Sequence, residues 1–355
     1  MGGMVAAPET SILGTSGPSI LAGPRSSFGQ SHPVVWFIAK RLGAGIVTLW
    51  VVSVLIFLCT SVLPGDAVMV VLGKSGTPET IAAIKAKLGL DHSLIQQYWS
   101  WLTGLLRGDF GKSAVALVQQ QPDPSIAHTL VDPLWNTFVL GTIAAILLVP
   151  FTLILGVIAG IKANKLLDHL ISTPSLIFAG LPEFVTGALL IWVFFTFLDL
   201  LPPVSLVAPG TSPLSDPKIL ILPIATLLLV AVGSGVRQVR LGMIEVLQTD
   251  FIQFARLNGI AERTVLVRYA IRNAVANSVQ TIAQNLQYLV GGIIVVEAVF
   301  TYPGIGVYLV QAVLARDTNK ILAAAIILAA FYTMLNIIAD LIVVFLVPKL
   351  RTELI

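Results

Sequence analysis

Three acidic residues, Glu183, Glu297 and Asp340, lie within or at the ends of long apolar runs. A carboxylate in lipid is costly, so each should face a bundle interior, water or a cationic partner. One reading is the lining of a path or a gate, where a carboxylate attracts a cationic group of a solute. The other is a tether between helices. Glu297 precedes the turn Pro303-Gly304, which favours a structural or gating position over direct contact with a solute.

Two stretches end like a phosphate-binding loop without completing the motif. Gly73-Lys74-Ser75 and Gly111-Lys112-Ser113 need a glycine five residues before their own glycine, where the sequence has Val68 and Leu106. The chain is therefore not expected to bind ATP itself.

No pattern of residues indicates a catalytic, metal or cofactor site. No nucleophile has a matching base, and the single cysteine, Cys59, excludes an intrachain disulfide and a cysteine cluster. The histidines fall in loops or in the amino-terminal tail, which leaves a histidine-based metal site or proton relay unsupported. They are His32, His92, His128 and His169.

The composition is that of a membrane protein. Of 355 residues, 56% are hydrophobic and 11% are charged, whereas soluble proteins carry about 25% charged residues. The formal net charge of +3 is too small and too scattered to suggest binding to nucleic acid.

Six apolar runs predict an all-α polytopic fold with six membrane helices, each long enough for a hydrocarbon core that needs about 20 residues. Pro174 and Pro182 predict kinks in the third run. The runs cover residues 34–63, 134–161, 170–198, 219–236, 275–300 and 321–347.

The segments outside these runs follow from composition and charge. Residues 1–33 are expected to be a disordered cytoplasmic tail, and 348–355 a cytoplasmic carboxyl terminus. Residues 64–132 are expected to form a small external domain with helices at 78–88 and 93–106, in which Trp99 and Trp101 suit a membrane interface. The cytoplasmic pieces then hold thirteen lysines and arginines against three in the short external loops. Both termini are therefore expected in the cytoplasm.

A polar, arginine-bearing island at 249–276 separates two apolar runs on that side. Asp250 and Gln253 predict a capping box at the start of a short helix, and Asn258-Gly259 predict its end. Such an amphipathic element can dock into a groove of a soluble partner, or it can be an ordinary solvated loop. The apolar residues predicted to share one stripe are Ile244, Leu247, Phe251 and Phe254.

The island resembles the cytoplasmic "EAA" loop of permease subunits in binding-protein-dependent ATP-binding-cassette (ABC) importers, in the form found in the dipeptide/oligopeptide/nickel branch. The sequence departs from the family-wide motif at Gln253-Phe254-Ala255, which replaces Glu-Ala-Ala, and at Ile271-Arg272, which replaces Leu-Pro. The matching residues are Asp250-Phe251-Ile252-x-x-Ala255-Arg256-x-x-Gly259, followed by Arg268-x-x-x-Arg272-Asn273-Ala274.

Other stretches resemble the B-type permease subunit of the same branch, which carries an external domain after its first span. The start of the second span, Asp132-Pro133-Leu134-Trp135-Asn136-Thr137, departs from the family's usual Arg-Leu-Pro-x-Thr. With the island, the matches cover nearly the whole chain after residue 33. They are Leu63-Pro64-Gly65-Asp66, Leu88-Gly89-Leu90-Asp91, Gln97-Tyr98-x-x-Trp101-Leu102, Gly108-Asp109-Phe110-Gly111-x-Ser113 and Glu297-Ala298-Val299-Phe300-Thr301-Tyr302-Pro303-Gly304-Ile305-Gly306.

The resemblance implies a type I ABC importer permease fold, with a core domain at 133–347 and a coupling loop at 237–274 that sits on an ATPase. It implies a homologous sister permease, two ATPase subunits, an extracytoplasmic binding protein, membrane lipid and a peptide cargo at the cytoplasmic (inner) membrane. ATP-driven closure of the ATPases would rock the bundle from inward-open to outward-open. The candidate coupling residues are Asp250, Phe251, Phe254, Ala255, Arg256, Gly259 and Arg263.

We therefore expect a non-enzymatic permease subunit for di- or oligopeptides, with ATP hydrolysed on partner subunits. One alternative is an ion-gradient-driven secondary transporter of small solutes, which typically shows paired broken helices in two repeated halves. No such repeat is visible in this sequence. Another alternative is an ABC importer for nickel chelate, glutathione or haem.

Overall fold

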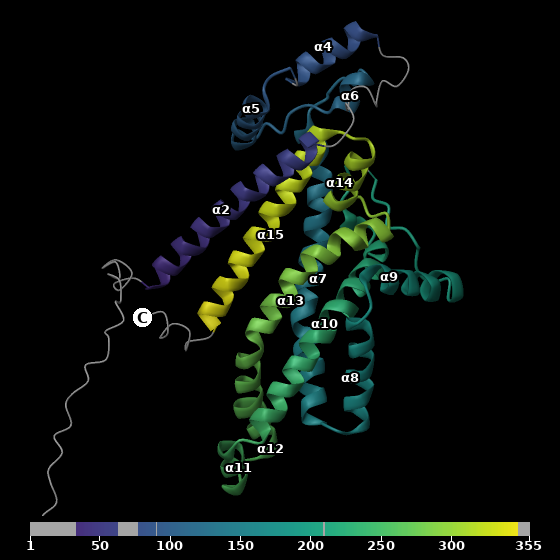
Figure 1. The fold of residues 1–355 in the computed structure, drawn as a ribbon. Helices are drawn as coiled ribbons and strands as arrows, with labels where there is room; N and C mark the ends of the chain where they lie inside the picture. Colours follow the sequence, from purple (N-terminus) through teal and green to yellow (C-terminus); the bar gives the residue numbers. More distant parts are fainter. Residues whose placement is uncertain (1–32, 63–76, 90, 209, 347–355) are drawn as a thin grey trace, which may run out of the picture.

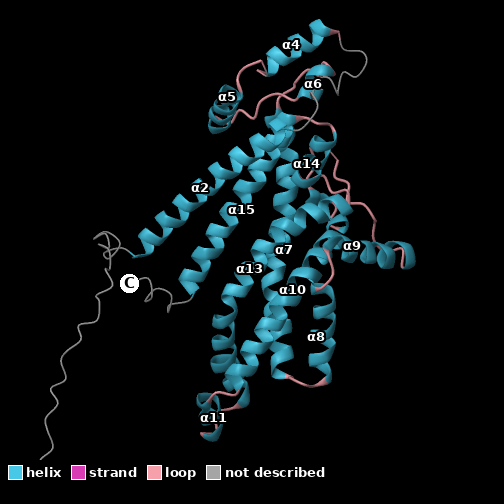
Figure 2. Cartoon of the chain, in the orientation of Figure 1, coloured by secondary structure: helices cyan, strands magenta, loops and turns pink. Residues whose placement is uncertain are grey.

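The computed structural model describes residues 33–62, 77–89, 91–208 and 210–346, and this part of the chain is built from helices (Figures 1 and 2). Within the described residues, the β-type pairing consists of one isolated antiparallel bridge between Lys112 and Ser125. The expected tail at 1–33 lies outside the described residues apart from Pro33, as do the motif Leu63-Pro64-Gly65-Asp66 and the terminus at 348–355.

Five of the described helices are long and apolar enough to cross a membrane, and a bent pair makes a sixth crossing if it counts as one span. The chain therefore has the all-α polytopic fold predicted from its sequence. The straight spans are α2 (Pro33–Val62), α7 (Ile126–Ile161), α10 (Lys218–Leu247), α13 (Ile271–Val299) and α15 (Thr318–Leu346). The bent pair is α8 (Leu166–Ala179) and α9 (Glu183–Ile191), which continues as the π-helical segment η2 (Trp192–Phe197).

The third apolar run is broken, not merely kinked as predicted. Helix α8 runs through Pro174, but the chain turns by 114° before α9. Pro182, with φ −61° and ψ 150°, directly precedes α9. Proline has no N–H to donate and disfavours helical geometry in the residue before it, so the helix cannot continue through this point. Helix α9 consequently leaves the direction of the bundle (Figure 1).

Two spans extend further than their apolar runs. Helix α7 begins at Ile126, inside the segment expected to be external, and it contains Pro133. Helix α10 continues past Val236 to Leu247. Arg237 and Arg240, which fall in the expected coupling loop at 237–274, therefore lie on the end of a membrane helix.

Helix α10 is the centre of the bundle and packs against α7, α8, α9 and α13. In its most apolar window 67% of the residues are buried, compared with 17% in α2. Gly156 and Gly160 let α7 approach closely: a Cβ on Gly156 would lie 2.5 Å from the Cβ of Val239, and one on Gly160 would lie 2.6 Å from the Cβ of Met243. Small residues four apart are a common device for close helix packing in membranes.

Helices α4 (Pro78–Leu88), α5 (Leu94–Leu106) and α6 (Ala114–Val118) gather at one end of the bundle, opposite the short helix α11 (Asp250–Leu257) (Figure 1). The helices predicted at 78–88 and 93–106 are confirmed. Ser93 caps α5 through a capping box with Gln96. The buried carboxylate of Asp317, just before α15, accepts a 2.5 Å hydrogen bond from the Ser113 hydroxyl. This bond fastens the start of α6 to the start of α15.

Helix α2 packs mainly along α15. Near its beginning the Arg41 guanidinium lies 2.9 Å from the Asp340 carboxylate on α15. Towards its other end Phe57 packs against Tyr98 and Trp101 of α5. The first and last membrane helices are thus joined directly near one end, and through the α5–α6 segment near the other.

Replacing Gly156 by valine should destabilise the subunit by about 1–3 kcal/mol or more, because the new side chain must displace Val239 and the backbone of α10. We expect a lower thermal melting midpoint for the purified protein in detergent. Gly43→Val on α2 is the matched control, since no atom lies within 4 Å of the Cβ position there. Equal melting of the two variants would contradict the close α7–α10 contact.

Candidate functional site

Helix α11 begins one residue earlier than a cap at Asp250 would require. Thr249 is the N-cap, with φ −70° and ψ 148°, and its hydroxyl donates to the carbonyl of Val246 at 2.6 Å. The predicted capping box is wrong: the Gln253 amide reaches back to the Gln248 carbonyl instead, at 3.4 Å. Asp250 is the first helical residue, where its negative charge interacts favourably with the helix dipole.

The two faces of α11 have opposite roles. Ile252 and Ala255 are buried in a small apolar base with residues from α10, α13 and the segment between α11 and α13. The predicted stripe that would join Ile244 and Leu247 to Phe251 and Phe254 is wrong, because the chain turns between α10 and α11. The outward face is an apolar crest formed by Phe251, Phe254 and Leu257, which are 45%, 69% and 85% exposed.

The turn after α11 fixes the crest in place. Gly259 has φ +75°, a left-handed conformation that suits glycine, and it ends the helix as predicted. Arg256 then forms two hydrogen bonds with Glu262 at 2.7 and 3.0 Å, and this contact lowers the pKa of the Glu262 carboxyl. The pair is exposed, so it adds little stability. Arg263 is exposed on α12 (Glu262–Thr264), beyond the turn.

A largely buried ion pair lies between α11 and the rest of the bundle. Asp168 on α8 is 1% exposed, and its two oxygens accept hydrogen bonds from Arg240 on α10 at 2.6 and 2.7 Å. The Asn164 backbone N–H and the Ser172 hydroxyl donate to the same carboxylate. The pair therefore ties the last turns of α10, the helix that directly precedes α11, to the start of α8.

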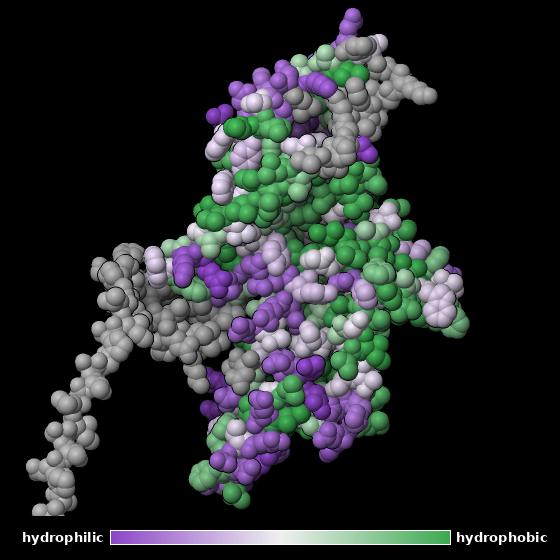
Figure 3. All heavy atoms as spheres, in the orientation of Figure 1, coloured by the Kyte–Doolittle hydropathy of each residue, from purple (hydrophilic) through white to green (hydrophobic). Residues whose placement is uncertain are grey.

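Helix α13 carries a polar face that is not buried within the subunit. Gln280, Gln284 and Tyr288 are exposed and Gln287 is half-buried, and all four lie on one side of the helix. Figure 3 shows hydrophilic and weakly polar surface over the middle of α13. Amide and hydroxyl groups are costly in contact with lipid tails. This face must therefore meet water or another polypeptide.

Glu183 and Asp340, two of the three predicted carboxylates, differ in their position relative to this polar face of α13. Glu183, at the start of α9, is half-buried and accepts a hydrogen bond from Tyr288. Asp340 instead pairs with Arg41 of α2, in the geometry of a tether between helices. Glu183 is thus the carboxylate that borders the polar face of α13.

Glu297 is fully buried at the junction of α7, α13 and α14 (Ile305–Leu314). It accepts a 2.5 Å hydrogen bond from the Thr137 hydroxyl and a 2.7 Å bond from the Gly306 backbone. A Cβ on Gly304 would collide with the carboxylate, so glycine is required there. This enclosed geometry favours the structural reading of Glu297.

The sequence reasoning missed the Asp168–Arg240 pair and the polar face of α13. In the sequence, Arg240 contributes only to the count of cytoplasmic positive charges. In the structure it lies on α10, because the helix of the preceding apolar run continues through it. The glutamines carry no charge, and no motif of the sequence marks them. Their signal was available in the mean hydropathy of Ser278–Val299, which at 1.4 is the lowest of the five straight spans.

Comparison with known proteins gives two family matches that together cover most of the chain. Residues 152–352 match the family described as binding-protein-dependent transport system inner membrane component, and residues 34–149 match the amino-terminal family of such membrane components. A putative peptide transport system permease protein of Brucella abortus is 31% identical over 316 residues, covering 89% of this chain and 99% of that protein. A glutathione transport system permease protein of Escherichia coli K12 is 32% identical over 315 residues, covering 89% and 98%.

Removing Arg240 should leave the buried Asp168 carboxylate without its counter-charge and cost about 1–3 kcal/mol. We expect Arg240→Met to lower the thermal melting midpoint markedly, and Arg240→Lys to restore little, because an ammonium cannot form the two parallel bonds. The double variant Asp168→Leu with Arg240→Met should recover much of the loss. An Arg240→Met melting midpoint equal to that of the parent protein would show that the ion pair does not stabilise the fold.

Proposed function

Because the chain belongs to the binding-protein-dependent transport system inner membrane components, we propose that it carries peptides across the cytoplasmic membrane as one of two permease subunits of an ATP-driven importer. The chain is a multi-pass permease of the ABC importer class, which sets aside an ion-gradient-driven transporter. Its sister subunit, the two ATPases, the extracytoplasmic binding protein and the cytoplasmic location of both termini are parts of this proposal.

The observation that carries the coupling role is the apolar crest of α11. Its three large apolar side chains are exposed, and α11 lies at the end of the bundle opposite α4, α5 and α6 (Figure 1). An exposed apolar helix face marks a contact with a partner, and a groove that accepts residues three apart is a common way to bind one. An ATPase cleft is the partner that the importer class requires.

Force on this crest would reach the bundle through rigid contacts. Ile252 and Ala255 hold α11 on the apolar base, which includes Met243 and Val246 of α10. Asp168 and Arg240 then tie α10 to α8. Ala255 thus acts from within as part of the base, whereas Phe251, Phe254 and Leu257 would make the contact. The contact with the ATPase would be fixed or surrounded by four further residues, Asp250, Arg256, Gly259 and Arg263.

The polar face of α13 supports a path between this subunit and a homologous sister. A water-filled path between two permeases would accommodate the amides of Gln280, Gln284 and Gln287 without exposing them to lipid. Glu183 would border the path and could attract the amino terminus of a peptide. The structure gives Glu297 and Asp340 polar partners of their own, so they would support the walls.

The choice of a peptide cargo follows the relatives. One similar protein is named a peptide permease and another a glutathione permease, and glutathione is itself a small peptide. Short peptides with a free amino terminus are therefore the first substrates to test, with glutathione beside them.

Phe254→Asp should abolish uptake of labelled dipeptides, tripeptides and glutathione by cells that depend on this chain, and an ATPase should no longer co-purify. A charge on the crest would have to be buried in the ATPase cleft without a partner, which is strongly unfavourable. Leu166→Asp is the matched control, because Leu166 is similarly exposed, at 74%, but lies on α8. A co-purifying ATPase and normal uptake in Phe254→Asp would contradict the coupling role.

Single cysteines should map the path. In a Cys59→Ser background we expect membrane-impermeant thiol reagents to label cysteines that replace Gln280, Gln284 and Tyr288. A cysteine that replaces Ile46, an exposed apolar residue of α2, should resist them because lipid covers it. Labelling of the α2 position with no labelling on α13 would reverse the assignment.

A further inference from the structure

Helix α5 carries an apolar stripe that the subunit leaves uncovered. Ile95, Trp99 and Leu106 are 72%, 55% and 80% exposed, and none of the thirteen residues of α5 is buried. The three positions fall within about 40° of one another around the helix, at 100° per residue. The stripe is continuous along α5, and contacts within this subunit do not explain it.

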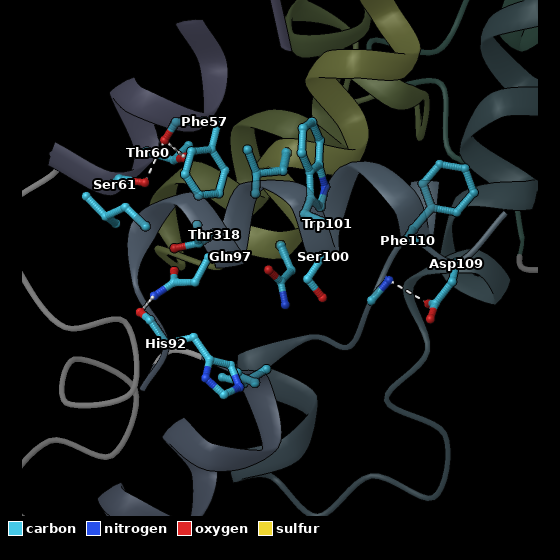
Figure 4. Close-up of a pocket in the computed structure, with 17 residues that line it drawn as sticks. Phe57, Thr60, Ser61, His92, Gln97, Ser100, Trp101, Asp109, Phe110 and Thr318 are labelled. Atoms are coloured by element: carbon cyan, nitrogen blue, oxygen red, sulfur yellow. Dashed lines mark hydrogen bonds between the residues drawn. The ribbon is translucent and has the colours of Figure 1, made fainter. Parts of the chain in front are cut away.

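The other side of α5 holds the helix against a membrane span. The rings of Tyr98 and Trp101 lie 5.3 and 6.2 Å from the ring of Phe57 on α2, between centroids. The Tyr98 hydroxyl is 3.0 Å from the hydroxyl of Ser53, also on α2. Next to these contacts is a cavity of about 380 Å³, bordered by α2, α5, the start of α15, the end of α4 with the turn after it, and the segment that follows α5 (Figure 4). Its presence leaves α2 as the main support of α5.

The contact with Ser53 fixes the height of α5 in the membrane. Ser53 lies five residues beyond the middle of the span Val35–Ser61, or about 7.5 Å along the helix at 1.5 Å per residue. The hydrocarbon core extends about 15 Å from its centre, and any tilt of α2 brings Ser53 closer to that centre. A helix whose tyrosine reaches Ser53 is held close to the hydrocarbon core, at the height where acyl chains meet head groups.

The distribution of charge agrees with this height. Helix α5 has no charged residue, whereas α4 carries Glu79, Lys85 and Lys87. The exposed apolar residues Trp50, Leu55 and Leu58 of α2 belong to a helix that spans the membrane. Figure 3 shows apolar surface over the outer part of α2, and apolar surface beside hydrophilic surface over α5. The stripe thus extends a surface that already faces lipid.

We propose that α5 is an interfacial helix, embedded in the membrane leaflet on the side of α4 and α6, with Ile95, Trp99 and Leu106 in contact with lipid. Amphipathic helices of this kind lie in the plane of the interface, and tryptophan favours that depth. Within the segment that the sequence assigns to an external domain, α5 is then covered by lipid, and α4 remains as the helix that a soluble binding protein can reach.

Spin labels can test the proposal on the full-length chain, purified with its bound subunits and reconstituted in phosphatidylethanolamine and phosphatidylglycerol vesicles. Single cysteines replace Ile95, Trp99 and Leu106 in a Cys59→Ser background. Ser100 is the matched position, because it is exposed and lies about 120° around α5 from the centre of the stripe. Leu55 on α2 and Lys87 on α4 provide the lipid and water references.

We expect labels at 95, 99 and 106 to collide readily with oxygen and poorly with a water-soluble nickel chelate, as at Leu55. The order should reverse at Ser100 and at Lys87. Chelate access at the stripe equal to that at Lys87 would place α5 in water and overturn the proposal. Protection of the stripe from both reagents would also overturn it, because another polypeptide would then cover α5. Neither outcome depends on the cargo or on coupling to an ATPase.

Discussion

The close approach of α7 and α10 at Gly156 and Gly160 is the contact on which the rest of the structure depends. Without side chains at these two positions the helix backbones come together, and α10 can run as one unbroken helix through the middle of the bundle. The Asp168–Arg240 pair lies at the same end and fixes α8 to the same helix. The base beneath α11 therefore rests on a part of the protein that has little freedom to shift.

The polar groups of the spans fall into two kinds, and the difference separates structural roles from candidate functional ones. The charged groups Glu297, Asp168 and Asp340 have polar partners inside the subunit. The uncharged amides of Gln280 and Gln284 project from the bundle. In lipid the cost of an unpaired polar group forces this separation. In this bundle the outward-facing amides are therefore stronger evidence for a translocation path than the buried charges are.

The sequence predicted the parts of this chain that local rules determine. Helix α5 begins where Ser93 and Gln96 form a capping box, and α11 ends where Gly259 takes a positive φ. It did not predict where α10 ends, because the polar residues after Val236 remain helical when Arg240 finds a buried partner in another helix. The direction of Phe251 and Phe254 also depended on the turn after Leu247, which no periodicity within one helix reveals. The family resemblance predicted a coupling helix in this stretch and placed Phe251 and Phe254 among its candidate residues, but Leu257, the most exposed side chain of the crest, became known only from the fold.

The fastening of α2 to α15 has a mechanical consequence. Arg41 and Asp340 join the two helices near one end, and at the other end the α5–α6 segment links Phe57 to Asp317 through Ser113. The four elements form a frame, and sliding α2 along α15 would have to break the contacts at both ends of it. A load on the first helix of the chain would therefore be shared by the last, which in turn packs against α13 and α14.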